Sequence, residues 1–289
     1  MGFRTIKITK RAKLNLTMGF LEIRGEQTLK VFLDDIDILV IDNPAVSMTA
    51  TLMSALMKKK IKVIFCDEKR NPQGELIPYY GSGDSARKVK MQTTWSNSVK
   101  ERVWTVIVRE KISNQARFLS ELGKSREEEL LESYIENLSE GDKTNREGLA
   151  AKVYFNALFG MDFKRDEETT VNAALNYGYS LLLSAVNKEI SYNGYITQLG
   201  LFHDNIYNPF NLASDLMEPF RVLVDRMVFE SEFTKFETEE KHVLLHLLEK
   251  EIKIGGSKQV LTNGIRIYVR SVFDALCDDN PQEILFYTL

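Results

Sequence analysis

The pattern of apolar residues changes once along the chain, and this change limits the fold more than any other feature of the sequence. Between residues 3 and 42, apolar and polar residues alternate in short runs such as TIKIT, KLNLTM and FLEIRG. Alternation with a period of two is typical of strands with one buried face. Beyond residue 86, apolar residues recur at helical spacing. We therefore expect an α+β protein, with a small β-rich N-terminal domain followed by a larger all-α domain.

The expected boundaries follow from the turn-forming residues. The first domain is predicted over residues 1–70, with Ser47 capping a helix to about Lys59 and IKVIFC returning as a strand. Residues 71–85 are dense in Gly, Pro and Ser and are predicted as a linker. Residues 86–289 are predicted as the helical domain. Its predicted helices cover 86–122, 125–138, 144–159, 166–188, 212–230, 236–253 and 257–276.

Size and composition indicate a soluble globular protein. The chain has 289 residues, which is enough for two domains. Of these residues, 44% are hydrophobic and 27% are charged. The long uncharged stretch 169–187 contains too many polar residues for a membrane span. Basic residues interrupt the N-terminal segment, where a secretory signal would be apolar. Two cysteines, Cys66 and Cys277, do not form a disulfide framework, so we expect a cytoplasmic protein.

Charge is unevenly distributed along the chain, although the net charge is only −3. Residues 86–117 contain eight Lys or Arg against two acids, and residues 1–30 contain seven against two. Residues 121–142 reverse this, with eight acids against two bases. Such segregation could hold a polyanion on one side of the molecule. The alternative is that these segments are ordinary solvated faces.

An acid lies on the apolar face of the predicted helix 144–159, TNREGLAAKVYFNALF. Glu147 precedes Ala150 and Ala151 by three and four residues, so its carboxylate points along the packed face. A buried carboxylate needs a cation, a metal or hydrogen-bond donors. Alternatively, Thr144 is the N-cap and Glu147 completes a capping box. The apolar stripe consists of Ala150, Val153, Tyr154, Ala157 and Leu158.

The three histidines lie in two different settings. His242 and His246 share one face of a predicted helix in KHVLLH, but Val243 stands where a zincin motif has Glu. The surrounding leucines favour an apolar helix with partly exposed imidazoles over a zinc site. His203 instead lies in the turn-rich loop QLGLFHDNIYNPFN. Loops positioned by helices often carry reactive groups.

A second pair of acids follows this loop. Asp215 and Glu218 are three residues apart in NLASDLMEPFRVLVDRMV, so they are neighbours on a helix surface. Two adjacent carboxylates repel each other unless a cation lies near, and Arg221 is one candidate for that cation. Pro219 is expected to bend the helix, or to begin a new one, where Glu218 projects.

Glu147, His203 and Glu218 together form a carboxylate, imidazole and carboxylate set. These ligands suit Mg²⁺ or Mn²⁺ with open water positions, and the lack of cysteine ligands argues against structural zinc. Spacing alone makes this a weak signal, because any helical protein of this size offers some such trio.

The order of the motifs adds a specific resemblance. The segments NREGLAAKVYFNALF, ALNYGYSLLLSAV, GLFH and NPFNLASDLMEPFR, after a β-rich start, resemble the CRISPR-associated adaptation integrases. These are the endonuclease-like subunits that insert spacers during antiviral defence. The resemblance covers essentially the whole chain. The short linker and compact length are most similar to the type II-A branch.

The resemblance implies which residues act. The metal and catalytic triad of the family, a glutamate, a histidine and an acid, corresponds to Glu147, His203 and Glu218, and Asp215 could be a neighbouring helper. The residues beside the motifs are candidates for DNA phosphate contacts, and these are Arg146, Lys152, Asn176, Tyr177 and Arg221.

The implied reaction is a transesterification. A DNA 3′-hydroxyl attacks a phosphodiester of the repeat, with Mg²⁺ or Mn²⁺ neutralising charge on the transferring phosphoryl group. The basic segments 1–30 and 86–117 then become DNA-facing surfaces with salt-dependent binding. The implied partners are double-stranded prespacer and repeat DNA and a small ferredoxin-like adaptor subunit. A homodimer is also implied, with the β-rich domain as our candidate interface, and type II-A systems add a ring-shaped DNA-binding protein and the RNA-guided effector nuclease.

Two alternatives remain open at this level. The same triad could activate water in a structure-specific nuclease acting on branched DNA. The chain could also be a catalytically idle DNA-binding scaffold.

Overall fold

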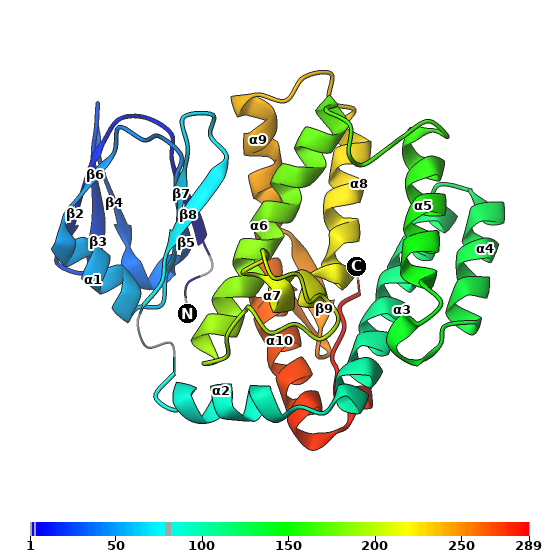
Figure 1. Ribbon diagram of the computed structural model, residues 1–289. Coiled ribbons are helices and arrows are strands. Elements are labelled where there is room, and N and C mark those ends of the chain that lie inside the picture. The colour runs from blue at the N-terminus through cyan, green and yellow to red at the C-terminus, as the bar shows by residue number, and fades with distance from the viewer. Residues whose placement is uncertain (1, 3, 79–81, 289) are drawn as a thin grey trace.

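The computed structural model describes residue 2, residues 4–78 and residues 82–288, and it has a strand-rich part followed by a helical part (Figure 1). The strands of the first part lie on the left of Figure 1, and the helices α2 to α10 fill the rest of the view. The predicted α+β class is therefore confirmed. Residues 79–81 of the predicted linker lie outside the described residues.

The first sheet is buried on both faces. Its strand order is β1-β5-β7-β8, formed by β1 (Arg4–Ile8), β5 (Ile36–Ile41), β7 (Lys62–Cys66) and β8 (Pro72–Leu76). The first three pair in parallel, and β8 adds an antiparallel edge. Ile38 and Val40 of β5 pack into the helical core, whereas Leu39 and Ile41 pack toward the second sheet. The continuous apolar run of β5 follows from this double burial.

The second sheet covers the outer face of the first. Its order is β4-β3-β2-β6, with β2 (Lys13–Thr17), β3 (Phe20–Arg24), β4 (Thr28–Phe32) and the short β6 (Ser47–Met48). Helix α1 (Ala50–Lys58) buries Leu52 and Leu56 in the same core. Large side chains remain exposed on this sheet, namely Met18, Phe20, Leu29 and Phe32.

Two local predictions in this region were wrong. The cap of α1 is Thr49, whose side chain accepts a hydrogen bond from the Leu52 amide at 3.3 Å, whereas Ser47 belongs to β6. Strand β8 lies within the segment predicted as a linker, so the first sheet continues to Leu76. Pro72 begins an edge strand, where a missing amide is tolerated, and this is why a turn-like composition could form a strand.

The helical part begins at α2, and in Figure 1 α6 lies on the side of this part that faces the strands. Its elements are α2 (Ser85–Thr94), α3 (Asn97–Glu121), α4 (Ser125–Glu136), α5 (Arg146–Phe159), α6 (Thr170–Tyr192), α7 (Asn211–Leu216), α8 (Arg221–Ser231), α9 (Thr238–Leu245), β9 (Glu251–Ile254), β10 (Ser257–Val260) and α10 (Leu261–Asp278).

Three predicted helices are interrupted. The helix predicted over 86–122 breaks at residues 95–96, where Ser96 caps α3. The helix predicted over 212–230 breaks at a 3-10 turn, Glu218–Phe220, as expected from Pro219. The helix predicted over 236–253 ends early, because residues 251–260 form an antiparallel hairpin. Ile252 and Ile254 point into the core while their neighbours are exposed, so this stretch has the period of a strand.

Polar contacts tie the two parts together beside the shared core. Lys188 on α6 forms an ion pair with Asp37 of β5, and both side chains are largely buried. The Asn187 amide donates to Glu75 of β8 at 3.2 Å. Lys241 of α9 donates to the Asn71 side chain at 2.9 Å. The helical part is therefore fixed against the first sheet.

No helix among the described residues is both long enough and apolar enough to cross a membrane.

Gly178 provides a test of the central packing. A methyl group at this position of α6 would clash with Val224 Cγ1 on α8. Overpacking costs about 1–3 kcal/mol, and the better helix propensity of Ala returns about 1 kcal/mol. We expect Gly178→Ala to lower the free energy of unfolding by up to about 2 kcal/mol in urea denaturation. Gly74→Ala, with nothing within 4 Å of the added carbon, is the control. A Gly178→Ala protein as stable as the Gly74→Ala protein would contradict this packing.

Candidate active site

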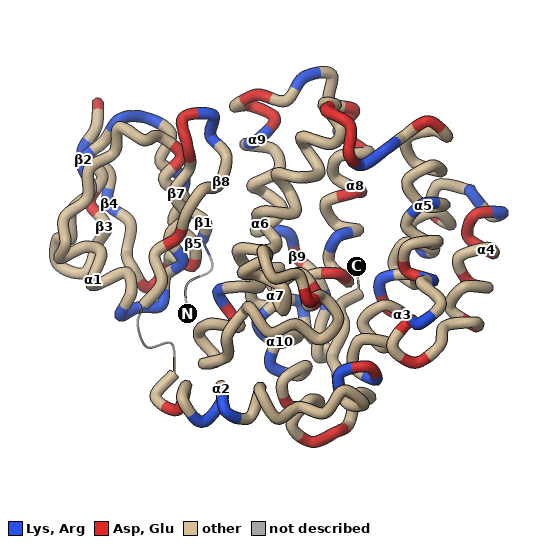
Figure 2. Tube along the Cα trace, viewed as in Figure 1, with Lys and Arg blue, Asp and Glu red and all other residues tan. Residues whose placement is uncertain are grey.

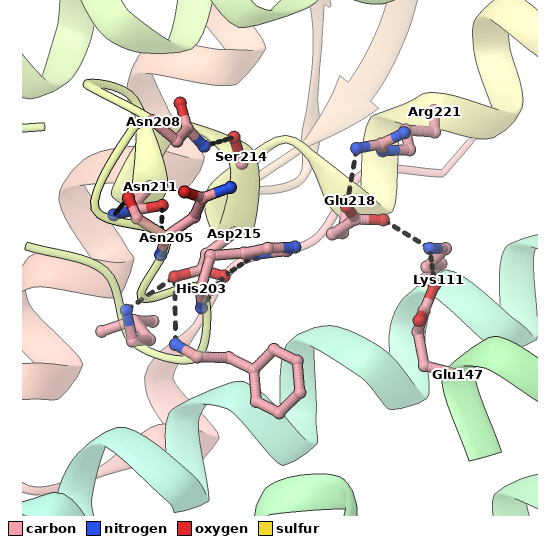
Figure 3. Close-up of polar contacts among 12 residues, drawn as sticks. Lys111, Glu147, His203, Asn205, Asn208, Asn211, Ser214, Asp215, Glu218 and Arg221 are labelled. Carbon is pink, nitrogen blue, oxygen red and sulfur yellow. Dashed lines mark hydrogen bonds and ion pairs between the residues drawn. The ribbon is translucent and has the colours of Figure 1, made fainter. Parts of the chain in front are cut away.

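A buried lysine joins two of the predicted acids. Lys111 of α3 forms ion pairs with Glu147 at the start of α5 and with Glu218 in the turn before α8, the latter at 2.5 Å (Figure 3). The exposed fractions of the three side chains are 8% for Lys111, 4% for Glu218 and 27% for Glu147. Burial alone would lower the pKa of the Lys111 ammonium, but the Glu218 and Glu147 carboxylates outweigh it and raise that pKa.

The first turn of α5 leaves the Glu147 side chain free to reach this cation. The N-cap is Asn145, whose side chain accepts from the Gly148 amide, so the capping box with Thr144 is wrong. The buried Asp142 carboxylate accepts hydrogen bonds from the Arg146 and Glu147 amides at 2.7 and 3.0 Å. A carboxylate at a helix N-terminus is favourable, and here Asp142 fills that role. Glu147 therefore faces the packed side, as its position in the apolar stripe predicted.

Glu218 is held by the break between α7 and α8. Pro219 cannot donate a backbone hydrogen bond, and its carbonyl accepts from the Asn114 amide group and from the Tyr287 hydroxyl, each at 3.1 Å. The Arg221 guanidinium contacts Glu218 Oε1 at 2.9 Å. Burial would raise the pKa of Glu218, but Arg221 and Lys111 outweigh burial and lower it. Glu218 is therefore an ionised carboxylate in a buried position.

Asp215 holds the histidine loop. Its carboxylate accepts from the backbone amides of Leu201, Phe202 and His203, at 2.6, 3.1 and 3.1 Å. It also lies 2.5 Å from His203 Nδ1. Asp215 is completely buried and contacts His203, but its predicted role as a helper acid stays a prediction. This hydrogen bond raises the pKa of His203, against the effect of burial.

Close packing explains why position 200, in the GLFH motif, is a glycine. A Cβ at Gly200 would clash with the His203 carbonyl oxygen and would lie 2.8 Å from Asp215 Oδ2. Only glycine lets the loop close around the carboxylate.

The three predicted ligands approach one another from separate elements. Figure 3 shows His203 and Asp215 on one side, and Glu218 with Lys111, Glu147 and Arg221 on the other. Glu218 contributes to raising the pKa of His203, so their charges interact. As they stand, no three His, Cys, Asp or Glu side chains within the described ranges are grouped closely enough to hold a metal ion. Lys111 occupies the space between the two glutamates instead.

The donor set nevertheless fits a hard divalent cation. Glu147 and Glu218 are ionisable oxygen ligands, and among the described residues the buried Oε2 atom of Glu218 is paired with the Lys111 ammonium. When neutral His203 donates its Nδ1–H to Asp215, the lone pair of Nε2 is left available. Two carboxylates and an imidazole suit Mg²⁺ or Mn²⁺.

The predicted DNA-contacting residues differ in their surroundings. Arg221 is in the site, and its guanidinium lies 4.7 Å from the centre of the Tyr179 ring. Lys152 is exposed on α5, and Asn176 is exposed and accepts from Arg165 at 2.7 Å. Arg146 lies over the Tyr134 ring. Tyr177 is only 3% exposed and packs against Phe236 and Lys241, so its hydroxyl does not face a surface that DNA could reach.

Sequence reasoning missed Lys111, which it counted only as one charge of the basic segment 86–117. The signal was present, because Lys111 falls at helical spacing with Trp104, Ile107 and Val108, all buried on α3. A lysine within an apolar stripe needs a buried partner, just as Glu147 does.

The His203 and Asp215 pair makes a prediction about pH. Asp215→Asn removes the charge that raises the pKa of His203, so that pKa should fall in an NMR titration of the imidazole protons. A raised folded pKa stabilises the protein below the ordinary histidine value of about 6.5, and this stabilisation is lost as pH rises through the folded value. We therefore expect Asp215→Asn to lose more stability at acidic than at alkaline pH.

Glu249→Gln is the matched control, because it removes a carboxylate 3.3 Å from His246 Nδ1. It should leave the pKa of His203 unchanged. An unchanged His203 titration in Asp215→Asn would contradict the assigned contact.

Comparisons with known proteins place the chain in a family. The family model described as CRISPR associated protein Cas1 matches residues 7–252. The CRISPR-associated endonuclease Cas1 of Neisseria meningitidis is 38% identical over 267 residues, covering 92% of this chain and 81% of that protein.

Solved structures share the fold. A casposase bound to integration product aligns with a TM-score of 0.77 at 19% identity, covering 96% of this chain and 91% of that chain. A Cas6-RT-Cas1–Cas2 complex aligns with a TM-score of 0.72 at 16% identity, and the match covers 97% of this chain but 36% of that longer chain. With the family model spanning most of its length and a relative at 38% identity, the chain belongs to the Cas1 family of CRISPR-associated proteins.

Proposed function

We propose that this protein is a metal-dependent DNA integrase of CRISPR adaptation, which joins spacer 3′-hydroxyl ends to repeat phosphodiesters. One observation carries the proposal. Glu147 and Glu218 converge on the buried ammonium of Lys111, beside the His203 imidazole, which Asp215 orients. The casposase relative, solved with an integration product, supports joining over hydrolysis as the reaction class.

The reaction depends on neutralising the charge of the phosphoryl group more than on a nucleophile from the protein. The 3′-hydroxyl oxygen forms a bond to the phosphorus and gives up its proton, the bond from phosphorus to the leaving 3′-oxygen breaks, and that leaving oxygen takes up a proton. When bound, Mg²⁺ or Mn²⁺ would supply Lewis-acid activation of the hydroxyl and would neutralise charge on the phosphoryl group. Glu147, Glu218 and the Nε2 atom of His203 would hold the ion.

The remaining polar groups orient and balance this site. Arg221 neutralises Glu218 on the side away from Lys111, and the Tyr179 ring stacks beneath its guanidinium. Tyr179 in turn donates to Asp225, a fully buried carboxylate whose pKa burial raises to about 7. This chain of contacts keeps Arg221 in place, where its remaining donors could bind a phosphate oxygen.

DNA would bind through phosphate contacts. Figure 2 shows Lys and Arg along α2 and on the edges of the strand-rich part. Segments 1–30 and 86–117, together with Arg146, Lys152 and Asn176, remain our candidate contacts, although Lys111 belongs to the interior. Affinity should therefore fall steeply with salt.

The proposed partners follow the family. The aligned Cas1–Cas2 complex supports a small adaptor subunit as partner. The exposed apolar side chains Met18, Leu29 and Phe32 on the second sheet support the strand-rich part as a homodimer interface. The type II-A ring protein and effector nuclease remain further proposed partners.

Glu147→Gln tests the reaction directly. In a strand-transfer assay on supercoiled repeat DNA with the adaptor present, joining should require Mn²⁺ or Mg²⁺ and should stop with EDTA. Losing an outer-shell partner of a metal costs about 10–100-fold, so losing a ligand should cost joining about 100-fold or more. DNA binding should be largely retained.

Glu101→Gln, which removes an acid paired with Lys143 on the surface, is the control and should join normally. A substrate ending in a 3′-deoxy nucleotide separates the alternatives. Cleavage that persists with this substrate, without joined product, would identify a nuclease on branched DNA. Unchanged function of Glu147→Gln would identify a scaffold and refute the triad.

A further inference from the structure

The position of Lys111 has a consequence for how a metal ion enters the site. Its ammonium pairs with Glu147 Oε1 and with Glu218 Oε2. Arg221 instead takes the other oxygen of Glu218, Oε1. Lys111 therefore bridges the two glutamates, with its ammonium in contact with one oxygen of each.

A divalent ion would need these same oxygens. An ion shared by Glu147 and Glu218 has to lie between the two carboxylates, and in this structure the Lys111 ammonium lies there.

The lysine also balances the charge of the two glutamates. Glu218 is almost completely buried, and a second carboxylate beside it would be repulsive without a cation. Lysine suits a temporary partner, because its ammonium is a point charge on a flexible stem and makes no bidentate contact.

We propose that Lys111 is the resident counter-ion of the active site, and that the divalent metal binds by displacing its ammonium from Glu147 and Glu218. The inference rests on the proposed metal-dependent function. Metal affinity then depends on competition between the metal and the Lys111 ammonium for the two carboxylates. The lysine weakens metal binding, but it keeps the site charge-balanced and correctly folded before the metal arrives.

Two substitutions at this position should change metal affinity in opposite directions. Lys111→Met removes the competing charge, so Mn²⁺ should bind about tenfold tighter or more in calorimetric titration of the full chain. Without metal, the melting temperature of Lys111→Met should be lower than that of the wild type. On adding Mn²⁺, the melting temperature of Lys111→Met should rise by more than that of the wild type. Lys111→Arg should bind Mn²⁺ more weakly, because a guanidinium can hold carboxylates with paired hydrogen bonds.

Lys188→Met is the matched control. Lys188 has the same 8% exposed fraction and also pairs with a carboxylate, but that partner is Asp37 between the two parts of the protein. Its loss should lower the melting temperature and leave Mn²⁺ affinity unchanged. A purely structural lysine at position 111 would behave in the same way.

The outcomes separate the exchange from the proposed function. If the wild type binds Mn²⁺ and Lys111→Met binds it equally or less tightly, displacement is refuted while the metal site stands. If Lys111→Met does not fold, the Lys111→Arg titration decides, and unchanged or tighter binding there refutes displacement. If neither the wild type nor any variant binds Mn²⁺, the metal-dependent function and the exchange are both refuted.

Discussion

The buried charge cluster around Lys111 determines how the helical part is assembled. Helix α3, the start of α5 and the turn before α8 each bring one charged group to it, and none of these could be buried alone. Paired, they fix the register of three elements that are far apart in the sequence. Removing one member leaves the others uncompensated, which costs far more than an exposed ion pair would.

The two parts of the protein are less independent than a division into domains implies. The first sheet contributes Ile38, Val40 and Ile64 to the core of the helical part, and its other face closes the strand-rich core. The buried pair of Lys188 and Asp37 adds a polar contact at this boundary. The strand-rich part therefore supports α6, the helix against which α7 and α8 pack.

Much of this could be predicted from sequence because it obeys periodicity. Alternation located β2, β3 and β4, and the helical stripe placed Glu147 on the packed face. Pro219 correctly predicted the break beside Glu218. The turn-rich segment around GLFH indicated a loop, although the reason for its glycine is visible only where Asp215 approaches the backbone.

The errors arise where tertiary contacts override local composition. Strand β8 forms from turn-like residues because it pairs with the edge of β7. The hairpin β9–β10 was not predicted because helical patterns lie on both sides of it. Lys111 was overlooked because a lysine in a basic segment is usually solvated. Its role depends on partners 36 and 107 residues away.

Pro219 links the acid at position 218 to distant parts of the chain. Its carbonyl is anchored by Asn114, 105 residues earlier, and by Tyr287, 68 residues later, whose ring stacks on Phe220. During synthesis on the ribosome, this turn cannot be fully fixed until residue 287 has emerged. A nascent chain therefore lacks one anchor of the turn that carries Glu218 until the segment around Tyr287 can pack against it.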